Sequence, residues 1–167
     1  MLRQNSPPLN WLNAGAVCLN FNLRRTARAV TQYYDEALKP TGVKVTQFTI
    51  LMAIASRTDH SITNIAQLAQ VDRTTLTRSL KILASDKFID IRKAQPGNKR
   101  RVSITPQGIK KMKQIYPYWF RAQRNLAKML TPQKTRSLRH LLTDAKAAAE
   151  VAMKGPGVPH LESPRVA

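Results

Sequence analysis

The stretch TNIAQLAQVDRTTLTRSLKILASDKFIDI, Thr63 to Ile91, reads as two short helices joined by a tight turn and followed by a strand. Thr63 is a good N-cap, because its side-chain oxygen can accept a hydrogen bond from a backbone N–H one turn further on. The apolar residues of the first helix then follow at helical spacing: Ile65, Leu68 and Ala69. Asp72 is a second N-cap, and its charge suits the positive end of a helix dipole. A new helix is therefore predicted from Arg73.

The second helix has a predicted buried stripe and a polar face. Its apolar residues recur at i, i+4 and i+7, with one more on the flank: Leu76, Leu80, Leu83 and Ile82. A polar face is usually only solvated, but Thr and Arg residues directly behind an N-cap and a tight turn favour a recognition helix. Arg78 can reach a guanine edge with two hydrogen bonds, and a Thr can meet a thymine methyl or a phosphate. We expect DNA contacts from these residues: Thr63, Arg73, Thr74, Thr75, Thr77, Arg78 and Lys81.

A basic β-hairpin is predicted after the two helices. Phe88, Ile89 and Ile91 are strand-like, and a second strand contains Val102 and Ile104. Between them, Arg92 to Arg101 (RKAQPGNKRR) holds a Pro-Gly turn signal flanked by basic residues. A helix-turn-helix followed by a charged hairpin is a winged helix, in which the second helix enters the major groove and the hairpin lies beside the backbone or minor groove. Three residues of the hairpin join the expected DNA contacts: Lys99, Arg100 and Arg101.

Further helices are predicted on both sides of this segment. From about Asn10 to Leu38, apolar residues repeat at alternating threes and fours and form one stripe, longer than a small lobe can cover. Lys39 to Gly42 ends that helix, and Thr46 is expected to cap the next one. Start signals for two later helices stand at Thr105-Pro106 and Thr131-Pro132, the first continuing through Pro117 to about Leu130. The expected fold class is mainly α, an α+β winged helix of six helices and one β-hairpin wing.

Three of these segments resemble the MarR family of bacterial transcription regulators. They are CLNFNLRRTARAVTQYYDEALKPTGVKVTQFTILMAIA (Cys18 to Ala55), the helix-turn-helix DRTTLTRSLKIL, and VSITPQG (Val102 to Gly108). The resemblance covers about residues 10 to 150 and implies a homodimer whose first and last helices form the interface, with two winged-helix lobes on a pseudo-palindromic site. Many members carry Asp-x-Arg at the wing tip, where this chain has Asn98-Lys99-Arg100, which makes Arg100 the best candidate for a wing contact.

The chain is expected to divide into four parts. The prolines near both ends predict a flexible N-terminal tail (1–9) and a disordered C-terminal tail (155–167). Between them, the resemblance implies a helical dimerisation region from both chain ends (10–38 and 106–154) and a winged helix-turn-helix DNA-binding lobe (39–105).

The charge of the chain agrees with a polyanionic partner. Twenty-eight Lys and Arg against nine Asp and Glu give a formal net charge of +19 over 167 residues. Between Asp72 and Lys113 alone there are twelve Lys and Arg against three Asp. Excess positive charge also occurs in ribosomal and membrane-surface proteins, so charge alone names no function. A nonspecific architectural or RNA-binding protein therefore stays open as an alternative, although it would not need capped helices at helix-turn-helix spacing.

Several other classes of protein are disfavoured. No run of 18 or more apolar residues is present, and the N-terminus lacks the apolar core of a signal peptide, so we expect a soluble cytoplasmic protein that does not contact a membrane. The single Cys and three scattered His give no metal-ligand spacing, so neither a metal nor another cofactor is expected. No phosphate-cradling Gly-rich loop, nucleophile beside a His or cluster of carboxylates is found, and we expect no enzymatic activity.

Two features point to regulation. Cys18 lies in the predicted first helix, where peroxide-sensing members of the MarR family keep a reactive Cys; the plainer interpretation is a small interface residue. Small aromatic acids commonly bind MarR-like dimers in the crevice between the dimer helices and the DNA lobe, where an anion would need an Arg. Six residues could line such a crevice, although aromatics at helical spacing are more often core: Arg28, Gln32, Phe48, Met52, Tyr116 and Trp119. The sequence thus predicts a homodimeric repressor released from double-stranded DNA by a small aromatic ligand, with thiol sensing through Cys18 as an alternative.

Overall fold

The computed structural model describes residues 15–56, 60–94 and 99–155, without the side chains of residues 60, 93, 94 and 99. Two compact units divide the chain, Met1–Ala122 and Gln123–Ala167, and each is described by itself. Among the described helices, none is long and apolar enough to span a membrane.

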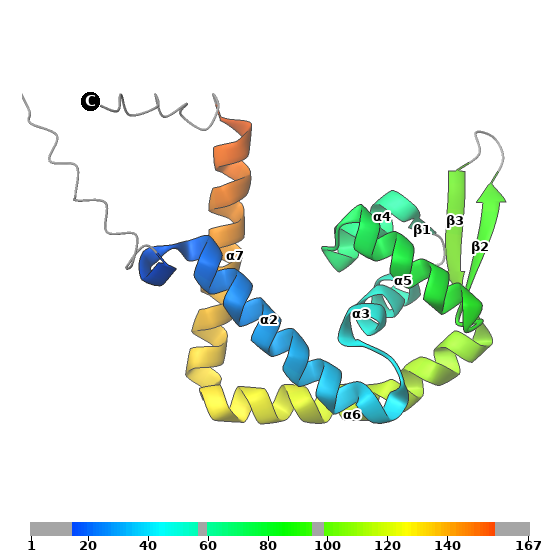
Figure 1. Ribbon diagram of the computed structural model, residues 1–167, viewed down its shortest axis with the longest axis horizontal. Helices are drawn as coiled ribbons and strands as arrows, with labels where there is room; N and C mark the ends of the chain where they lie inside the picture. The colour runs from blue at the N-terminus through cyan, green and yellow to red at the C-terminus, as the bar shows by residue number, and fades with distance from the viewer. Residues whose placement is uncertain (1–14, 57–59, 95–98, 156–167) are drawn as a thin grey trace, which may run out of the picture. The chain divides into compact units, whose positions relative to one another are not determined.

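Helices dominate the described chain, and one small sheet accompanies them (Figure 1). The elements in chain order are α2 (Leu19–Leu38), the 3-10 helix η1 (Lys39–Thr41), α3 (Val45–Ala55), β1 (His60–Ser61), α4 (Ile62–Ala69), α5 (Arg73–Ser85), β2 (Ile89–Ala94), β3 (Lys99–Ile104), α6 (Pro106–Leu130) and α7 (Pro132–Lys154). The mainly α winged-helix fold predicted from the sequence is confirmed.

The sheet has three antiparallel strands in the order β1-β3-β2. The predicted hairpin is β2 and β3, with Ile89 opposite Ile104 at its base and Ala94 opposite Lys99 at the far end. β1 was not predicted, because two residues are too few to show the alternation that marks a strand. It pairs with the free edge of β3 and so ties the start of α4 to the wing.

The core of the first unit lies between the helix-turn-helix, α3 and the sheet. Leu76, Leu80 and Leu83 of α5 are buried as predicted, against a cluster that includes Phe48 and Ile65. These apolar side chains fix which face of α5 is turned to solvent.

Two of the predicted core positions are wrong. Ile82 of α5 and Leu68 of α4 are exposed to 41% and 49% of their surface. The buried stripe of α5 instead takes in Ser79, because a 3.6-residue period places it beside Leu76 and Leu83, whereas Ile82 falls on the flank of the helix.

Of the three N-caps predicted for α3, α4 and α5, only one agrees with the structure. Asp72 caps α5, which begins at Arg73. Thr63 does not cap α4: Ser61 does, and its hydroxyl accepts from the backbone N–H of Asn64 at 3.2 Å. Thr46 lies inside α3, which begins one residue earlier. At α4, Ser61 and Thr63 stand close together, and composition cannot tell which of them takes the extended backbone of a cap. At α3 the cap position is Lys44, whose backbone N–H donates to Gln47 Oε1 at 2.8 Å.

The predicted first helix is interrupted at Cys18. Its expected start lies outside the described part of the chain, residues 15–17 are helical, and α2 begins at Leu19 after the break. Cys18 has extended backbone (φ −71°, ψ 112°), and its Sγ accepts from the N–H of Phe21 at 3.5 Å. Cys18 is therefore the N-cap of α2 and not an interior residue. The end of the helix at Leu38 is as predicted, and Gly42 turns the chain at φ +71°.

The start of α6 is tied to the end of α5. The Thr105 hydroxyl accepts from the N–H of Gly108 at 3.0 Å, as the predicted cap, and donates to the carbonyl of Lys87 at 2.7 Å. The Thr105 N–H donates to the carbonyl of Phe88 at 3.1 Å. Gly108 is buried so close to that carbonyl that a Cβ there would collide with it. The Ile-Thr-Pro-Gln-Gly motif thus closes the base of the hairpin.

In the second unit, α7 starts at the predicted Thr131-Pro132 signal. The Thr131 hydroxyl accepts from the N–H of Lys134 at 3.4 Å, and the Thr135 hydroxyl donates to the carbonyl of Thr131 at 2.8 Å. No described residue of α7 is buried, and Leu141 and Met153 expose 64% and 73% of their surface. Apolar side chains of this helix are thus exposed within the described part of the second unit.

Candidate nucleic-acid interface

The exposed face of α5 carries five of the residues predicted to contact DNA. Arg73, Thr77 and Lys81 follow each other at intervals of four and form one row along the helix. Thr74 and Arg78 form a second row beside it. All five are exposed. The second helix of the helix-turn-helix therefore offers three cations and two threonine side chains to the groove of a duplex.

Asp72 holds the first turn of this helix in place. Its two carboxylate oxygens accept from the backbone N–H of Thr75 at 2.9 Å and from the Thr75 hydroxyl at 2.6 Å. These bonds, that from the hydroxyl first, lower the pKa of Asp72 below its usual value of 3.8. The carboxylate is thus ionised at neutral pH and fixes the end of the helix that would meet DNA.

The stabilisation from Asp72 is expected to depend on pH. Because its folded pKa is lowered, the stabilisation is fully present above the unfolded pKa and is lost as the pH falls through the folded pKa. Asp72→Asn keeps a capping oxygen but no charge. The difference in free energy of unfolding between the wild type and this variant is expected to stay constant between about pH 5 and 7 and to become smaller below about pH 4. Urea titrations across this range measure the difference, and a difference that does not change with pH would contradict the lowered pKa of Asp72.

Thr75 is set apart from the other threonines of α5. It is half-buried on the flank of the helix away from Thr77, and its hydroxyl is engaged by Asp72. Thr77 is exposed, and its hydroxyl donates to the carbonyl of Arg73 at 2.7 Å. The predicted contact residues therefore differ in whether their hydroxyl groups are already hydrogen-bonded within the protein.

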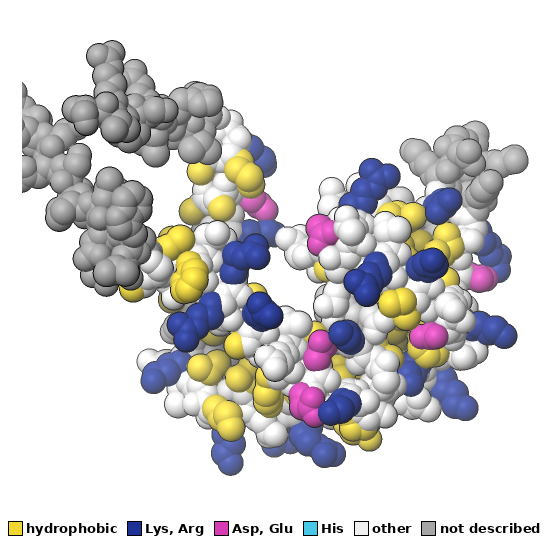
Figure 2. All heavy atoms as spheres, in the orientation of Figure 1, with side chains coloured by type: hydrophobic (Ala, Val, Ile, Leu, Met, Phe, Trp, Pro, Cys, Tyr) yellow, Lys and Arg dark blue, Asp and Glu magenta, His cyan; other side chains and the backbone are white. Residues whose placement is uncertain are grey.

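A groove brings three predicted contact residues from different elements together. Thr63 of α4, Arg73 of α5 and Arg100 of β3 line it. It passes from the start of α4 across the first turn of α5 to the wing. In Figure 2, Lys and Arg side chains are spread over the visible face of the lobe that carries these elements. The positive groups of helix and wing are thus parts of one continuous surface.

The wing adds cations along its outer face. Arg92 and Arg101 stand directly opposite each other on β2 and β3, a like-charge pair that would be unfavourable alone. Arg92 also pairs with Asp90 at 2.9 Å, which offsets part of that repulsion. Arg92 was counted among the basic residues of the hairpin but was not predicted as a DNA contact. The alternation of side chains along the strand could have shown that it points to solvent. Asn98 and the side chain of Lys99 lie outside the described part of the chain.

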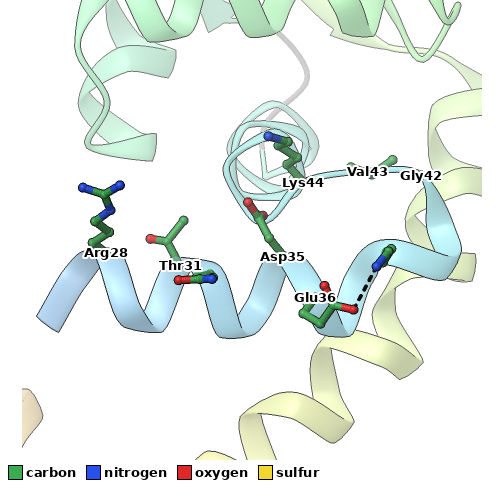
Figure 3. A pocket seen from close by; sticks show the side chains of 9 residues that line it. Arg28, Thr31, Asp35, Glu36, Gly42, Val43 and Lys44 are labelled. Carbon is green, nitrogen blue, oxygen red and sulfur yellow. Dashed lines mark hydrogen bonds and ion pairs between the residues drawn. The ribbon is translucent and has the colours of Figure 1, made fainter. Parts of the chain in front are cut away.

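The six residues predicted for an effector crevice occupy two different places. Arg28 and Gln32 line an open depression beside η1 and the start of α3, where Asp35 accepts from the N–H of Val45 at 2.8 Å (Figure 3). Phe48 is fully buried and packs against Trp119, with ring centroids 6.0 Å apart. Met52 is half-buried against the core, and Tyr116 is exposed beside Trp119, with ring centroids 5.7 Å apart.

Cys18 is exposed at the N-terminus of α2, where its thiol serves as the helix cap. Thiol sensing through this residue stays a prediction.

Comparison with known proteins agrees with this geometry. The model of the MarR family matches residues 43–102, which span α3, the helix-turn-helix and most of the wing. The chain is similar to the transcriptional regulator MosR of M. tuberculosis, at 30% identity over 78% of this chain and 97% of that one, with a TM-score of 0.67. A structure of MosR in complex with DNA matches at 28% identity over 78% and 98% of the two chains, also with a TM-score of 0.67.

A more distant likeness concerns the fold alone. A mutant of E. coli MarR complexed with operator DNA is 20% identical over 80% of this chain and 97% of that one, with a TM-score of 0.71. Among curated proteins, none matches the chain.

Proposed function

The chain belongs to the MarR family and is a DNA-binding transcriptional regulator, and from this premise we propose that it acts as a homodimeric repressor on a pseudo-palindromic operator. The observation that carries the proposal is the exposed face of α5, where Arg73, Thr74, Thr77, Arg78 and Lys81 stand behind the Asp72 cap. Two such helices would enter successive major grooves, with half-sites about 10 bp apart on one face of the duplex.

Exposed apolar side chains support a second copy of the chain as partner. In the first unit, Leu19 and Phe21 at the start of α2 expose 75% and 52% of their surface. In the second unit, α7 exposes a further set of apolar side chains: Leu138, Leu141, Leu142, Val151 and Met153. Apolar surface on this scale is costly in a lone monomer and is typical of an interface. Homodimerisation through the two ends of the chain would cover it.

Release from the operator is proposed to follow the binding of a small aromatic acid. Arg28 projects from α2 beside an open depression in which it could pair with a carboxylate (Figure 3). An effector that prefers a spacing of the two lobes that does not fit the half-sites must weaken DNA binding by its own difference in affinity. In BpsR of Bordetella bronchiseptica, whose structure matches at 17% identity with a TM-score of 0.71, DNA binding is regulated by 6-hydroxynicotinic acid.

A competition assay tests the proposed function against the architectural alternative. Labelled duplex from the region upstream of the protein's own gene is expected to stay bound in a large excess of unrelated duplex at physiological salt. If unrelated duplex competes equally well, sequence-specific regulation is refuted and a nonspecific nucleic-acid binder is favoured.

Loss of the Arg78 side chain from the exposed face of α5 is expected to weaken specific DNA binding more than nonspecific binding. Arg78→Ala should cost roughly 1–3 kcal/mol on the operator, because a bidentate contact to a guanine edge would be lost. On random DNA the loss should be small. Binding isotherms on both duplexes measure the difference, with Arg25→Ala on α2 as a control of equal charge change. Equal loss on both duplexes would contradict a base-reading role for Arg78.

A further inference from the structure

The threonines on α5 differ in the hydrogen-bonding capacity that they can offer to DNA. The Thr75 hydroxyl donates to Asp72 Oδ2 at 2.6 Å, and the Thr77 hydroxyl donates to the carbonyl oxygen of Arg73 at 2.7 Å. Neither acceptor carries a hydrogen at neutral pH, so the direction of both bonds is fixed. Each of these hydroxyl groups has therefore used its only hydrogen inside the protein. Thr74 is exposed, and within the described chain no bond of its hydroxyl is found.

The acceptors on DNA cannot be served by a hydroxyl in this state. Phosphate oxygens, guanine N7 and O6, and thymine O4 all need a donor. To reach one of them, Thr77 would have to give up its bond to the Arg73 carbonyl, and the exchange of one such bond for another gains little free energy. What Thr77 can offer at no such cost is its methyl group, or a lone pair of its hydroxyl to a base amino group such as adenine N6 or cytosine N4. The two variants below separate these, because only one of them keeps the hydroxyl.

The backbone of α5 also directs that methyl group. The Oγ1 of Thr77 lies back over the preceding turn, within 2.7 Å of the Arg73 carbonyl. Staggering about the Cα–Cβ bond then places the Cγ2 methyl in a different well, away from that carbonyl. Thr77 stands in the same exposed row as Arg73 and Lys81, so its methyl group belongs to the surface that would face the bases.

We propose that Thr77 determines specificity through its methyl group, by packing against the C5-methyl group of a thymine in the major groove, and that it donates no hydrogen bond to DNA. The inference rests on the proposed function, since it assigns one position of the operator to one side chain. Among the α5 threonines, Thr74 is then the one with a hydroxyl that can donate to DNA.

Two nearly isosteric variants separate the methyl group from the hydroxyl. Thr77→Val keeps the branched shape and the methyl group and loses the hydroxyl. The Arg73 carbonyl keeps the backbone N–H at position 77 as its helical partner, so no polar group is left unpaired. Thr77→Ser keeps the hydroxyl and loses the methyl group. Circular dichroism melts of both variants establish that each is folded before binding is measured.

The test is in vitro selection from duplexes with a randomised core, carried out with the full-length wild type and both variants. Wild type and Thr77→Val are expected to select the same sequence and to bind it within about twofold of each other. Thr77→Ser is expected to lose its preference for thymine at one position of each half-site, and affinity by about fourfold per half-site, the ratio for burial of one methyl group. Deoxyuridine in place of that thymine should lower wild-type affinity by the same factor and leave Thr77→Ser unchanged.

The opposite order of the variants overturns the inference: a preference lost in Thr77→Val and kept in Thr77→Ser identifies a hydroxyl contact. The same selected sequence and affinity for all three proteins overturns it as well, since Thr77 then reads no base. A wild type that enriches no sequence at all overturns the proposed function itself, and with it the inference.

Discussion

Raising the monovalent salt concentration from 50 to 200 mM is expected to weaken DNA binding by roughly four to seven orders of magnitude. If a dimer touches roughly 8 to 12 phosphates, the logarithm of affinity falls against the logarithm of salt concentration with a slope of roughly −7 to −11, because each contact releases condensed counterions. The formal net charge of +19 per chain supports contacts on this scale. Fluorescence anisotropy of a labelled duplex at stepped salt concentrations measures the slope.

A pair of variants shows where the slope originates. Arg100→Gln removes an exposed cation at the groove shared by α4, α5 and β3, and two copies per dimer should flatten the slope by about 2. Arg25→Gln makes the same charge change on α2 and is expected to alter the slope by less than about 0.5. A wild-type slope near −2, or equal effects of the two variants, would contradict the proposed interface.

Gly108→Ala is expected to lower the free energy of unfolding by about 3 kcal/mol, the upper end of the usual cost of overpacking. A Cβ at this position would collide with the backbone carbonyl of Phe88 and crowd the side chain of Ile104, both in the closed base of the hairpin. This carbonyl lies in the helix-to-strand junction between α5 and β2, and it cannot turn aside as the end of a flexible side chain can. Relief of the collision would therefore also break the bond from the Thr105 N–H to the same carbonyl. Urea unfolding at fixed protein concentration measures the loss.

Gly155→Ala is the matched control for this substitution. There a Cβ would meet only the carbonyl oxygens of Val151 and Ala152, at 3.7 and 3.9 Å, which is ordinary contact. Its effect is expected to stay within about 0.5 kcal/mol of the wild type. If Gly108→Ala is as stable as Gly155→Ala, the described packing at the base of the hairpin is wrong.

The parts of the fold that the sequence predicted are those in which one residue type has one physical role. An Asp ahead of a Thr-rich helix can satisfy backbone N–H groups in only one way, and Asp72 caps α5 as expected. A Pro after a Thr likewise marked the start of α6 at Pro106. The leucine stripe of α5 followed from its period alone, and with it the outward direction of Arg78.

Other predictions failed where several residues could play the same role or where distant parts of the chain decide. The N-cap of α4 fell to Ser61 in place of Thr63, since both can accept the same bond. The strand at Ser61 depends on β3, about 40 residues away, and leaves no local signal. The hydrogen bond from the Thr77 hydroxyl to the Arg73 carbonyl could not be predicted from the sequence either, because it depends on the side-chain rotamer.

The closed base of the hairpin couples the wing to the first turn of α6. Thr105 holds the carbonyls of Lys87 and Phe88, and Gln107 Nε2 donates to the carbonyl of Asp86 at 3.2 Å, so three successive carbonyls after α5 are bound to the first turn of α6. Gly108 packs against the same segment and leaves no space for a side chain at this junction. We therefore expect the wing to move together with the first turn of α6 and not independently of it.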